Sequence, residues 1–354
     1  MPAIDQNRLE EFLGKAVGDI GAAMSAALVL VGDRLGLYKA LGVTPMTSLE
    51  LATRTGTSER MVREWLLNQA AGGYIRYDIA SKKYSMSPEQ AFALADETSP
   101  AFLPGAFEII QSIMRDEPKV TEAFKTGRGV PWGAHDSCLF CGTERFFGPN
   151  YRGNLVATWI PALDNMDARL KAGAAVADVG CGHGISTLLM AKAFPLSKFT
   201  GLDLHPASIE CARKRAAEGG LPNVSFEVAD ATNFASPQGG FDLIACFDCL
   251  HDMGDPAGCA AHVRRSLRTN GIWMIVEPNA ADRVEENFNP VGRLFSAAST
   301  MICVPAALAQ GTSSPALGAC AGPAKLKEVV TKAGFTKFRV ATTTAFNLVI
   351  EARP

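Results

Sequence analysis

A glycine-rich turn between an apolar segment and a helix limits this chain to few folds. Residues 176–184 read VADVGCGHG, and the helical segment ISTLLMAKAF follows. A short apolar run that ends in Gly180, Gly182 and Gly184 indicates a buried strand that opens into a turn. Because open α/β sheets bind ligands at the carboxyl ends of their strands, the turn predicts an α/β domain with a ligand site there.

The rest of the C-terminal half extends this pattern to seven strands. The first five strands alternate with helical segments, which favours a parallel sheet covered by helices on both faces. The last two are joined by only a few residues, so they form a hairpin in which one strand runs antiparallel. The six strands after the glycine turn are SKFTGLDL, NVSFEVAD, FDLIACFD, GIWMIVEP, FTKFRVAT and AFNLVIEA.

The N-terminal half is mostly helical. A long helix is expected over residues 9–41, and residues 47–85 follow the order helix, turn, helix and two short strands, which is the winged-helix order. Thr47 or Ser48 is expected to cap the first short helix, and Ser58 to begin the second. Residues 1–85 hold ten Lys or Arg and nine Asp or Glu. Because a DNA-binding face is usually basic, we expect a scaffold or dimerisation module here and no nucleic-acid partner.

Composition disfavours a membrane protein, a secreted protein and a nucleic-acid-binding protein. Hydrophobic residues make up 47%, charged residues 20%, and the formal net charge is -2. These values are typical of a globular protein without general attraction to nucleic acid or acidic membranes. No apolar run reaches the roughly 20 residues of a membrane span, and the N-terminus lacks a signal-peptide pattern. We therefore expect a cytoplasmic protein with no membrane association.

The cysteines suggest neither a disulfide framework nor a metal site. There are nine, an odd number, and they are spread along the chain. Cys138 with Cys141, and Cys246 with Cys249, have CxxC spacing. The second pair lies inside an apolar run, where cysteine behaves as a small hydrophobe, so no metal is expected.

Acidic residues at successive strand ends indicate the kind of ligand. Asp178 precedes the glycine turn, Asp203 ends the second strand 23 residues after Gly180, and Asp230 ends the third. The GxGxG spacing departs from the GxGxxG of dinucleotide folds, and Asp178 places negative charge where a pyrophosphate would sit. The pattern disfavours a nicotinamide dehydrogenase and suits a ligand that carries an ammonium and a sulfonium. A carboxylate such as that of Asp203 can accept both hydroxyls of a ribose.

Residues 178–184, DVGCGHG, resemble the first motif of class I S-adenosylmethionine-dependent methyltransferases. The resemblance implies a seven-stranded Rossmann-like sheet, S-adenosylmethionine as cofactor and S-adenosylhomocysteine as product. It also implies a cofactor pocket formed by the glycine turn and by the residues that end the first four strands. These are Asp178, Gly180, Gly182, Gly184, Asp203, Leu204, Asp230, Ala231, Phe247 and Asp248.

The sequence CFDCLHDMGDP narrows the resemblance. It is similar to small-molecule O-methyltransferases that have an N-terminal winged-helix dimerisation domain, where a His-Asp pair follows the fourth strand. The resemblance implies that His251, next to Asp252, is the general base, although Met253 stands where a tryptophan often follows. A histidine of ordinary pKa, about 6.5, can take a proton from a hydroxyl at neutral pH. The carboxylate that supports it stays open among Glu277, Glu285 and Glu286.

Acceptor contacts are expected from an aromatic, glycine-rich stretch at 127–151, expected to be irregular, from the helix that follows, and from residues 287–320. Their apolar content indicates a small apolar or aromatic acceptor, and plain core or dimer packing is the open alternative. The candidates are Trp132, His135, Phe147, Tyr151, Trp159, Phe295 and Met301.

These observations give one expected organisation and one alternative. We expect a winged-helix domain over 1–100, a helical substrate-covering region over 101–171 and a methyltransferase domain over 172–354. The expected function is methyl transfer to oxygen of a small acceptor, in a homodimer formed through the N-terminal helices. The alternative is a winged-helix transcriptional regulator whose C-terminal domain senses a ligand.

Overall fold

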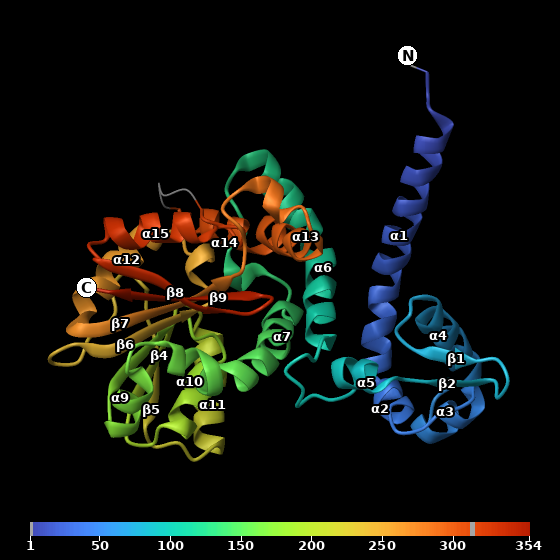
Figure 1. Cartoon of the computed structure of the whole chain (residues 1–354), viewed down its shortest axis with the longest axis horizontal. Helices are drawn as coiled ribbons and strands as arrows, with labels where there is room; N and C mark the ends of the chain where they lie inside the picture. The colour runs from blue at the N-terminus through green and yellow to red at the C-terminus, as the bar shows by residue number, and fades with distance from the viewer. Residues whose placement is uncertain (1–2, 312–315) are drawn as a thin grey trace. The chain divides into compact units, whose positions relative to one another are not determined.

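The computed structural model describes residues 3–311 and 316–354, which fall into two compact units (Figure 1). Unit 1 holds the residues up to Ser112 with Cys138–Pro149, and unit 2 holds Ile113–Ser137 with Asn150–Pro354. The boundaries fall inside helices α6 and α7. The expected three-part division stays a prediction.

Unit 1 contains the predicted winged helix. The Thr47 hydroxyl accepts the Glu50 N–H at 3.2 Å, and the Glu50 carboxylate accepts the Thr47 N–H at 2.7 Å. This reciprocal cap pairs two backbone donors at the start of α3 and explains why the helix begins there. The elements are α1 (Gln6–Arg34), α2 (Leu37–Leu41), α3 (Ser48–Thr55), α4 (Glu59–Ala71), β1 (Arg76–Asp78), β2 (Lys83–Ser85), α5 (Pro88–Leu94), and parts of α6 (Pro104–Thr126) and α7 (Cys138–Asn154).

The first helix is shorter than expected. α1 ends at Arg34, and Gly36, at φ +69°, precedes α2. A left-handed residue cannot continue an α-helix, so the prediction of one helix over 9–41 is wrong at this point. Both α1 and the helical run Pro290–Ala309 are long and apolar enough to pass a composition test for a membrane span, which core helices of soluble proteins pass as well.

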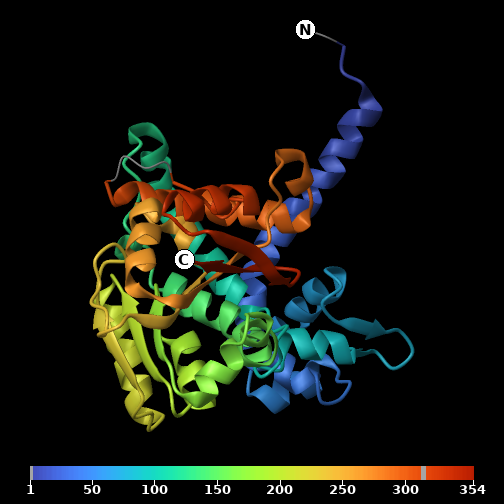
Figure 2. The same cartoon turned by 60° about the vertical axis from the view of Figure 1, so that its left-hand side comes forward.

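Unit 2 is built on a seven-stranded sheet of order β5-β4-β3-β6-β7-β9-β8 (Figure 2). The pairs from β5 to β7 are parallel, and β9 runs antiparallel to both β7 and β8, so the hairpin prediction is confirmed. The strands are β3 (Ala175–Val179), β4 (Lys198–Asp203), β5 (Val224–Val228), β6 (Phe241–Phe247), β7 (Leu267–Pro278), β8 (Lys337–Thr343) and β9 (Asn347–Arg353). The helical segments are η1 (Trp132–Ala134), η2 (Leu155–Trp159), α8 (Ile160–Ala162), α9 (Met166–Ala172), α10 (Ile185–Ala193), α11 (Pro206–Glu218), η3 (Leu250–Asp252), α12 (Pro256–Ser266), η4 (Val284–Asn287), α13 (Pro290–Ala298), η5 (Ser299–Cys303), α14 (Val304–Ala309) and α15 (Pro323–Lys332).

Helices cover both faces of the sheet. Cys259 of α12 and Leu326 of α15 pack in one core cluster with Ala177 of β3. Because side chains alternate along a strand, Asp178 points to the opposite face. There it meets α10, whose Ser186 binds it.

The helical run Pro290–Ala309 widens into a π-turn at η5. Pro305 has no N–H to donate to the turn before it, and Val304 donates instead to the carbonyl of Ser299, five residues back. The same device occurs at η2, ahead of Pro161. Such turns redirect the side chains they carry, and η5 ends at Cys303.

The stretch 127–151 is only partly irregular, which corrects the expectation of a loop throughout. Apart from η1 its first part has no helix or strand, but α7 begins at Cys138. Position 142 in this helix is occupied by glycine, and a Cβ there would come 2.8 Å from the backbone nitrogen of Ile109. A glycine needed for close helix packing looks like a loop residue in the sequence.

Candidate active site

The glycine turn wraps around the end of strand β4. The Gly180 N–H donates to the carbonyl of Leu202 at 2.7 Å, and the Gly182 N–H donates to the carboxylate of Asp203 at 2.8 Å. A Cβ at Gly180 would lie 2.6 Å from Sγ of Cys249, whereas one at Gly182 would meet no described atom within 4 Å. Gly180 is therefore required for packing of the turn, and Gly182 leaves the backbone open to a ligand.

Asp178 is fully buried beside the turn. Its Oδ2 accepts the hydroxyls of Ser186 and Thr187, both at 2.6 Å. Its Oδ1 is buried and has no hydrogen-bond partner among the described residues. Burial raises the pKa of Asp178 to about 7, although the two hydroxyls oppose the shift. An unpaired buried carboxylate oxygen is costly by itself and is suited to a cationic ligand.

Asp203 ends β4, and its carboxylate holds the backbone of the glycine turn and of the segment after the strand. Its Oδ2 accepts the Gly182 N–H and its Oδ1 accepts the His205 N–H, each at 2.8 Å. Burial raises its pKa, and the two backbone donors oppose this. Each oxygen keeps a second lone pair, so the side chain can still accept hydroxyl groups. Leu204, the next residue, is exposed.

Asp230 and Ala231 follow β5 in a tight turn. The Asp230 carboxylate accepts both the N–H of Thr232 at 2.7 Å and its hydroxyl at 2.6 Å. These bonds fix the backbone after the strand. The adenine contact implied for this position stays a prediction.

Phe247 ends β6, and Asp248, the next residue, has an unusual backbone conformation. Its φ of +50° is rare for a residue with a side chain, and such conformations concentrate at functional sites. The Tyr151 hydroxyl donates to one carboxylate oxygen at 2.9 Å, and the Asn347 amide donates to the other at 2.8 Å. Burial first, and Glu277 second, raise the pKa of Asp248 to about 7.

His251 lies in η3, directly after this strand end. Its Nδ1 is 2.5 Å from Oε2 of Glu277, and Oε1 of Glu277 accepts the Leu250 N–H at 2.9 Å. Burial lowers the pKa of His251, but Glu277 and Cys303 raise it, and the net direction is well above the ordinary value. Glu277 at the end of β7 is thus the carboxylate that contacts the histidine.

The other acidic residues considered as partners of His251 are Glu285, Glu286 and Asp252. Glu285 and Glu286 are exposed on η4 and pair with Arg283. Asp252 ends η3, and burial raises its pKa to about 7 although His251 opposes the shift. Cys303, which sequence reasoning missed, adds to the upward shift of the His251 pKa.

The predicted acceptor residues have varied surroundings. Tyr151 and Trp159 are buried with ring centroids 5.8 Å apart, and Tyr151 holds Asp248. His135 is buried, and its Nδ1 is 2.8 Å from Asp116. Trp132 lies in η1, Phe295 is buried in α13, Met301 is half-buried in η5, and Phe147 belongs to unit 1. Their contact with an acceptor stays a prediction.

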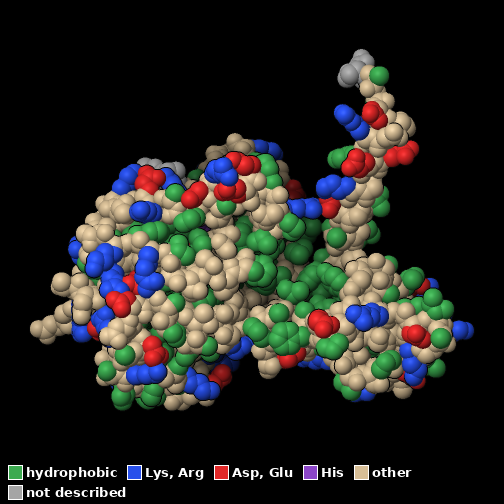
Figure 3. Space-filling view, in the orientation of Figure 1, with side chains coloured by type: hydrophobic (Ala, Val, Ile, Leu, Met, Phe, Trp, Pro, Cys, Tyr) green, Lys and Arg blue, Asp and Glu red, His purple; other side chains and the backbone are tan. Residues whose placement is uncertain are grey.

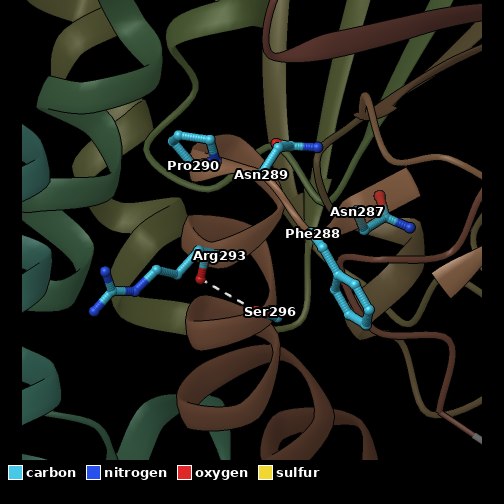
Figure 4. A pocket seen from close by; sticks show the side chains of 6 residues that line it. All are labelled: Asn287, Phe288, Asn289, Pro290, Arg293 and Ser296. Atoms are coloured by element: carbon cyan, nitrogen blue, oxygen red, sulfur yellow. Dashed lines mark hydrogen bonds between the residues drawn. The ribbon is translucent and has the colours of Figure 1, made fainter. Parts of the chain in front are cut away.

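A hollow of about 600 Å³ lies at the start of α13 (Figure 4). Two of its polar side chains already make hydrogen bonds within the chain. The Asn289 carboxamide accepts the Gly292 N–H at 2.9 Å, and the Asn287 amide donates to the carbonyl of Ala281 at 3.0 Å. We do not place the reaction there. Within the described residues no group of three or more His, Cys, Asp or Glu side chains is arranged to hold a metal ion.

Family models match both parts of the chain. Residues 170–334 match a methyltransferase domain, and residues 23–96 match an Rv2258c-like winged helix-turn-helix domain. A trans-aconitate 2-methyltransferase of Acidovorax sp. (strain JS42) is 36% identical over 108 residues, which is 30% of this chain and 40% of the relative. The chain thus matches about two fifths of that relative's length.

Solved structures match nearly the whole chain. An O-methyltransferase family protein of Burkholderia thailandensis has a TM-score of 0.68 at 19% identity, covering 99% of each chain. A methyltransferase of calicheamicin biosynthesis, in its S-adenosylhomocysteine-bound form, has a TM-score of 0.67 at 18% identity and covers 99% of this chain and 100% of its own. At this identity the likeness shows a common fold, that of class I methyltransferases.

Proposed function

The chain carries a methyltransferase domain behind a winged helix-turn-helix domain, and on this premise we propose that it transfers a methyl group from S-adenosylmethionine to a small molecule. One observation carries the proposal. Asp178 has a buried carboxylate oxygen without a partner among the described residues, next to a turn whose backbone is open at Gly182. Such a site is suited to a cationic group, and S-adenosylmethionine has two.

The residues that would hold the cofactor follow from this geometry. Asp178 and the backbone at Gly182 would meet its amino acid end, and the remaining lone pairs of Asp203 would accept its ribose hydroxyls. When bound, S-adenosylmethionine supplies an electrophilic methyl group. The chain's own task is then to place an acceptor atom in line with that group and to remove its proton.

His251 is the proposed proton acceptor. Because Nδ1 faces Glu277 at 2.5 Å, the neutral imidazole keeps its proton on Nδ1 and presents the lone pair of Nε2. The Glu277 carboxylate also stabilises the imidazolium that forms. This base suits an acceptor hydroxyl, so we propose O-methylation of a small apolar or aromatic acceptor, with Asp252 close to the base.

The assembly we propose is a homodimer formed through α1. Apolar side chains on this helix are more than half exposed, including Phe12, Val17, Ile20 and Met24. Hydrophobic side chains reach the surface along α1 in Figure 3. A regulator that binds DNA is not favoured, because Arg60 and Arg63 of α4 pair with acids of the same helix. We propose a cytoplasmic location.

Calorimetry on the purified chain tests the cofactor proposal. We expect heat of binding with S-adenosylhomocysteine and none with NAD⁺ at the same concentrations. Binding of NAD⁺ without binding of S-adenosylhomocysteine would contradict it.

A further inference from the structure

His135 is a buried histidine whose two ring nitrogens have different surroundings. Its side chain is 1% exposed, and its Nδ1 lies 2.8 Å from the carboxylate of Asp116. Its Nε2 is buried and has no hydrogen-bond partner within residues 3–311 and 316–354. A buried ring nitrogen without a partner is costly, and such groups are rare unless a ligand pairs with them. The proton transfer assigned to His251 does not use this side chain.

The contacts of Asp116 determine which nitrogen of His135 carries the proton. Its carboxylate also accepts the N–H of Asp136 at 2.9 Å and the ammonium of Lys119 at 2.6 Å. Burial raises the pKa of Asp116, but these donors and His135 lower it, and the net direction is below the ordinary value. Because Lys119 already balances the carboxylate charge, a neutral imidazole that donates from Nδ1 completes the group. The lone pair of Nε2 is then left to accept a hydrogen bond.

The segment that carries His135 reaches the carboxyl end of strand β4. His135 directly follows η1, and a Cβ at Gly133 in η1 would lie 3.4 Å from Cδ2 of His205. The backbone N–H of His205 is bound to the carboxylate of Asp203 at 2.8 Å. The segment therefore packs beside the proposed ribose site.

The same segment is also bound to α14, and α14 is bound to the segment of the proposed base. The Val130 N–H donates to the carbonyl of Pro305 in α14 at 3.0 Å. Gln310, which follows α14, donates its side-chain amide to the carbonyl of Asp252 at 3.1 Å, and Asp252 is next to His251. Residues 130–135 thus connect the end of β4 to a helix fixed against η3. This places His135 at the edge of the sheet where the proposed reaction occurs.

We propose that His135 binds the methyl acceptor by accepting, on Nε2, a hydrogen bond from a hydroxyl other than the one that is methylated. The inference rests on the proposed function and narrows the acceptor to a small aromatic molecule with at least two hydroxyl groups. His251 takes the proton of one hydroxyl, whereas the hydroxyl at His135 keeps its proton. An acceptor without this second hydroxyl leaves Nε2 unpaired, so the site discriminates against it.

Calorimetry on the full chain with four small probes tests the inference. The probes are phenol and its three relatives with one more hydroxyl, namely catechol, resorcinol and hydroquinone. We expect at least one of the three to bind about tenfold more tightly than phenol, because it satisfies an otherwise unpaired buried acceptor. The measurement is made with and without S-adenosylhomocysteine.

Two substitutions separate the two nitrogens of His135. The amide of asparagine reaches the position of Nδ1, so His135→Asn keeps a donor for Asp116 and loses the acceptor at Nε2. The advantage of the second hydroxyl should be lost in this variant. The amide of glutamine reaches the position of Nε2, so His135→Gln, the matched comparison, should keep part of the advantage.

The inference is overturned if none of the three dihydroxybenzenes binds more tightly than phenol, which includes the case in which no probe binds. It is also overturned if a folded His135→Asn protein keeps the full advantage. If that variant does not fold, nitrogen-15 NMR of the wild type gives the second measurement. A His135 Nε2 resonance, assigned by its absence in His135→Gln, that does not move when the tightest probe is added overturns the inference. Because the probes are also measured without cofactor, this failure is distinct from failure of the proposed methyl transfer, which S-adenosylhomocysteine binding reports.

Discussion

Among single residues, Asp178 lowers the stability of the unliganded protein and is also a proposed contact of the cofactor. A carboxyl whose pKa is raised by folding binds its proton more tightly in the folded state. The free energy of unfolding therefore falls as pH rises from the ordinary value of 3.8 towards about 7, and the loss persists above that pH. The proposed contact with a cationic cofactor would offset this cost, because one carboxylate oxygen of Asp178 has no partner among the described residues.

We expect Asp178→Asn to stabilise the unliganded protein at pH 8 and to weaken cofactor binding. The gain in free energy of unfolding should be about 2–4 kcal/mol at pH 8 and close to zero at pH 4. Urea denaturation at both pH values measures it, with Glu227→Gln, an exposed change on β5, as control. Equal stability of wild type and Asp178→Asn at pH 8 would show that the buried carboxylate carries no penalty.

Asp203→Ala should weaken S-adenosylhomocysteine binding by more than tenfold. The change removes the acceptor proposed for the ribose hydroxyls and also frees the N–H groups of Gly182 and His205. Asp203→Asn separates these effects, because its one carbonyl oxygen keeps part of the hydrogen bonding. An unchanged dissociation constant in the alanine variant, measured by calorimetry, rules out the ribose role.

The protonation of His251 can be measured without knowing the acceptor. We expect its imidazole to titrate above pH 6.5, and Glu277→Gln to move the midpoint to lower pH, since the neutral amide no longer stabilises the cation. The chain has five histidines, and His251→Asn identifies the resonance in nitrogen-15 NMR spectra. A midpoint that stays in place in Glu277→Gln contradicts the proposed coupling. We expect turnover to rise with pH, because His251 must lose its proton before it can act as the base.

At the level of elements, the π-turn η5 depends on Pro305, which has no N–H to donate to the turn before it. Pro305→Ala restores an N–H donor and allows a regular α-helix through this point. The melting temperature, measured by circular dichroism, should change little, since the added hydrogen bond offsets the greater flexibility of the unfolded chain. Pro161→Ala, in the corresponding turn at η2, should have a similarly small effect, and a large fall in either variant would contradict this account.

The same scale explains which elements the sequence predicts well. The central strands β6 and β7 carry apolar runs bounded by glycine and acidic residues, and the N-cap residues Thr47 and Ser58 are local signals. The break at Gly36 and the start of α7 at Cys138 depend on one backbone conformation and on helix packing, which have no local pattern.

The site residues likewise divide into those that the sequence indicates and those that only the fold brings together. Asp178 and Asp203 are indicated by their position at the ends of strands, and His251 by the resemblance of the segment that follows the fourth strand. Glu277, 26 residues from His251, was only one of three possible partners. The contact of Tyr151 with Asp248 joins segments far apart in sequence, so only the folded chain brings them together.

On the scale of the whole molecule, α1 has an apolar face that the described chain does not cover. Leu13, Val17, Ile20 and Met24 are exposed and are spaced by four, three and four residues, so they share one side of the helix. Monomeric proteins rarely leave such a stripe in water. A second copy of the same helix offers a matching surface, as two-fold interfaces require.

Substitution within this stripe tests the homodimer. Light scattering after size exclusion should give a mass of twice 37.6 kDa for the wild type. The double variant Val17→Asp/Ile20→Asp should give 37.6 kDa, because a buried charge without a partner opposes association. Glu11→Gln, an exposed change on the same helix, should leave the mass unchanged. A wild type of 37.6 kDa, or a double variant that keeps the doubled mass, excludes this face as the dimer interface.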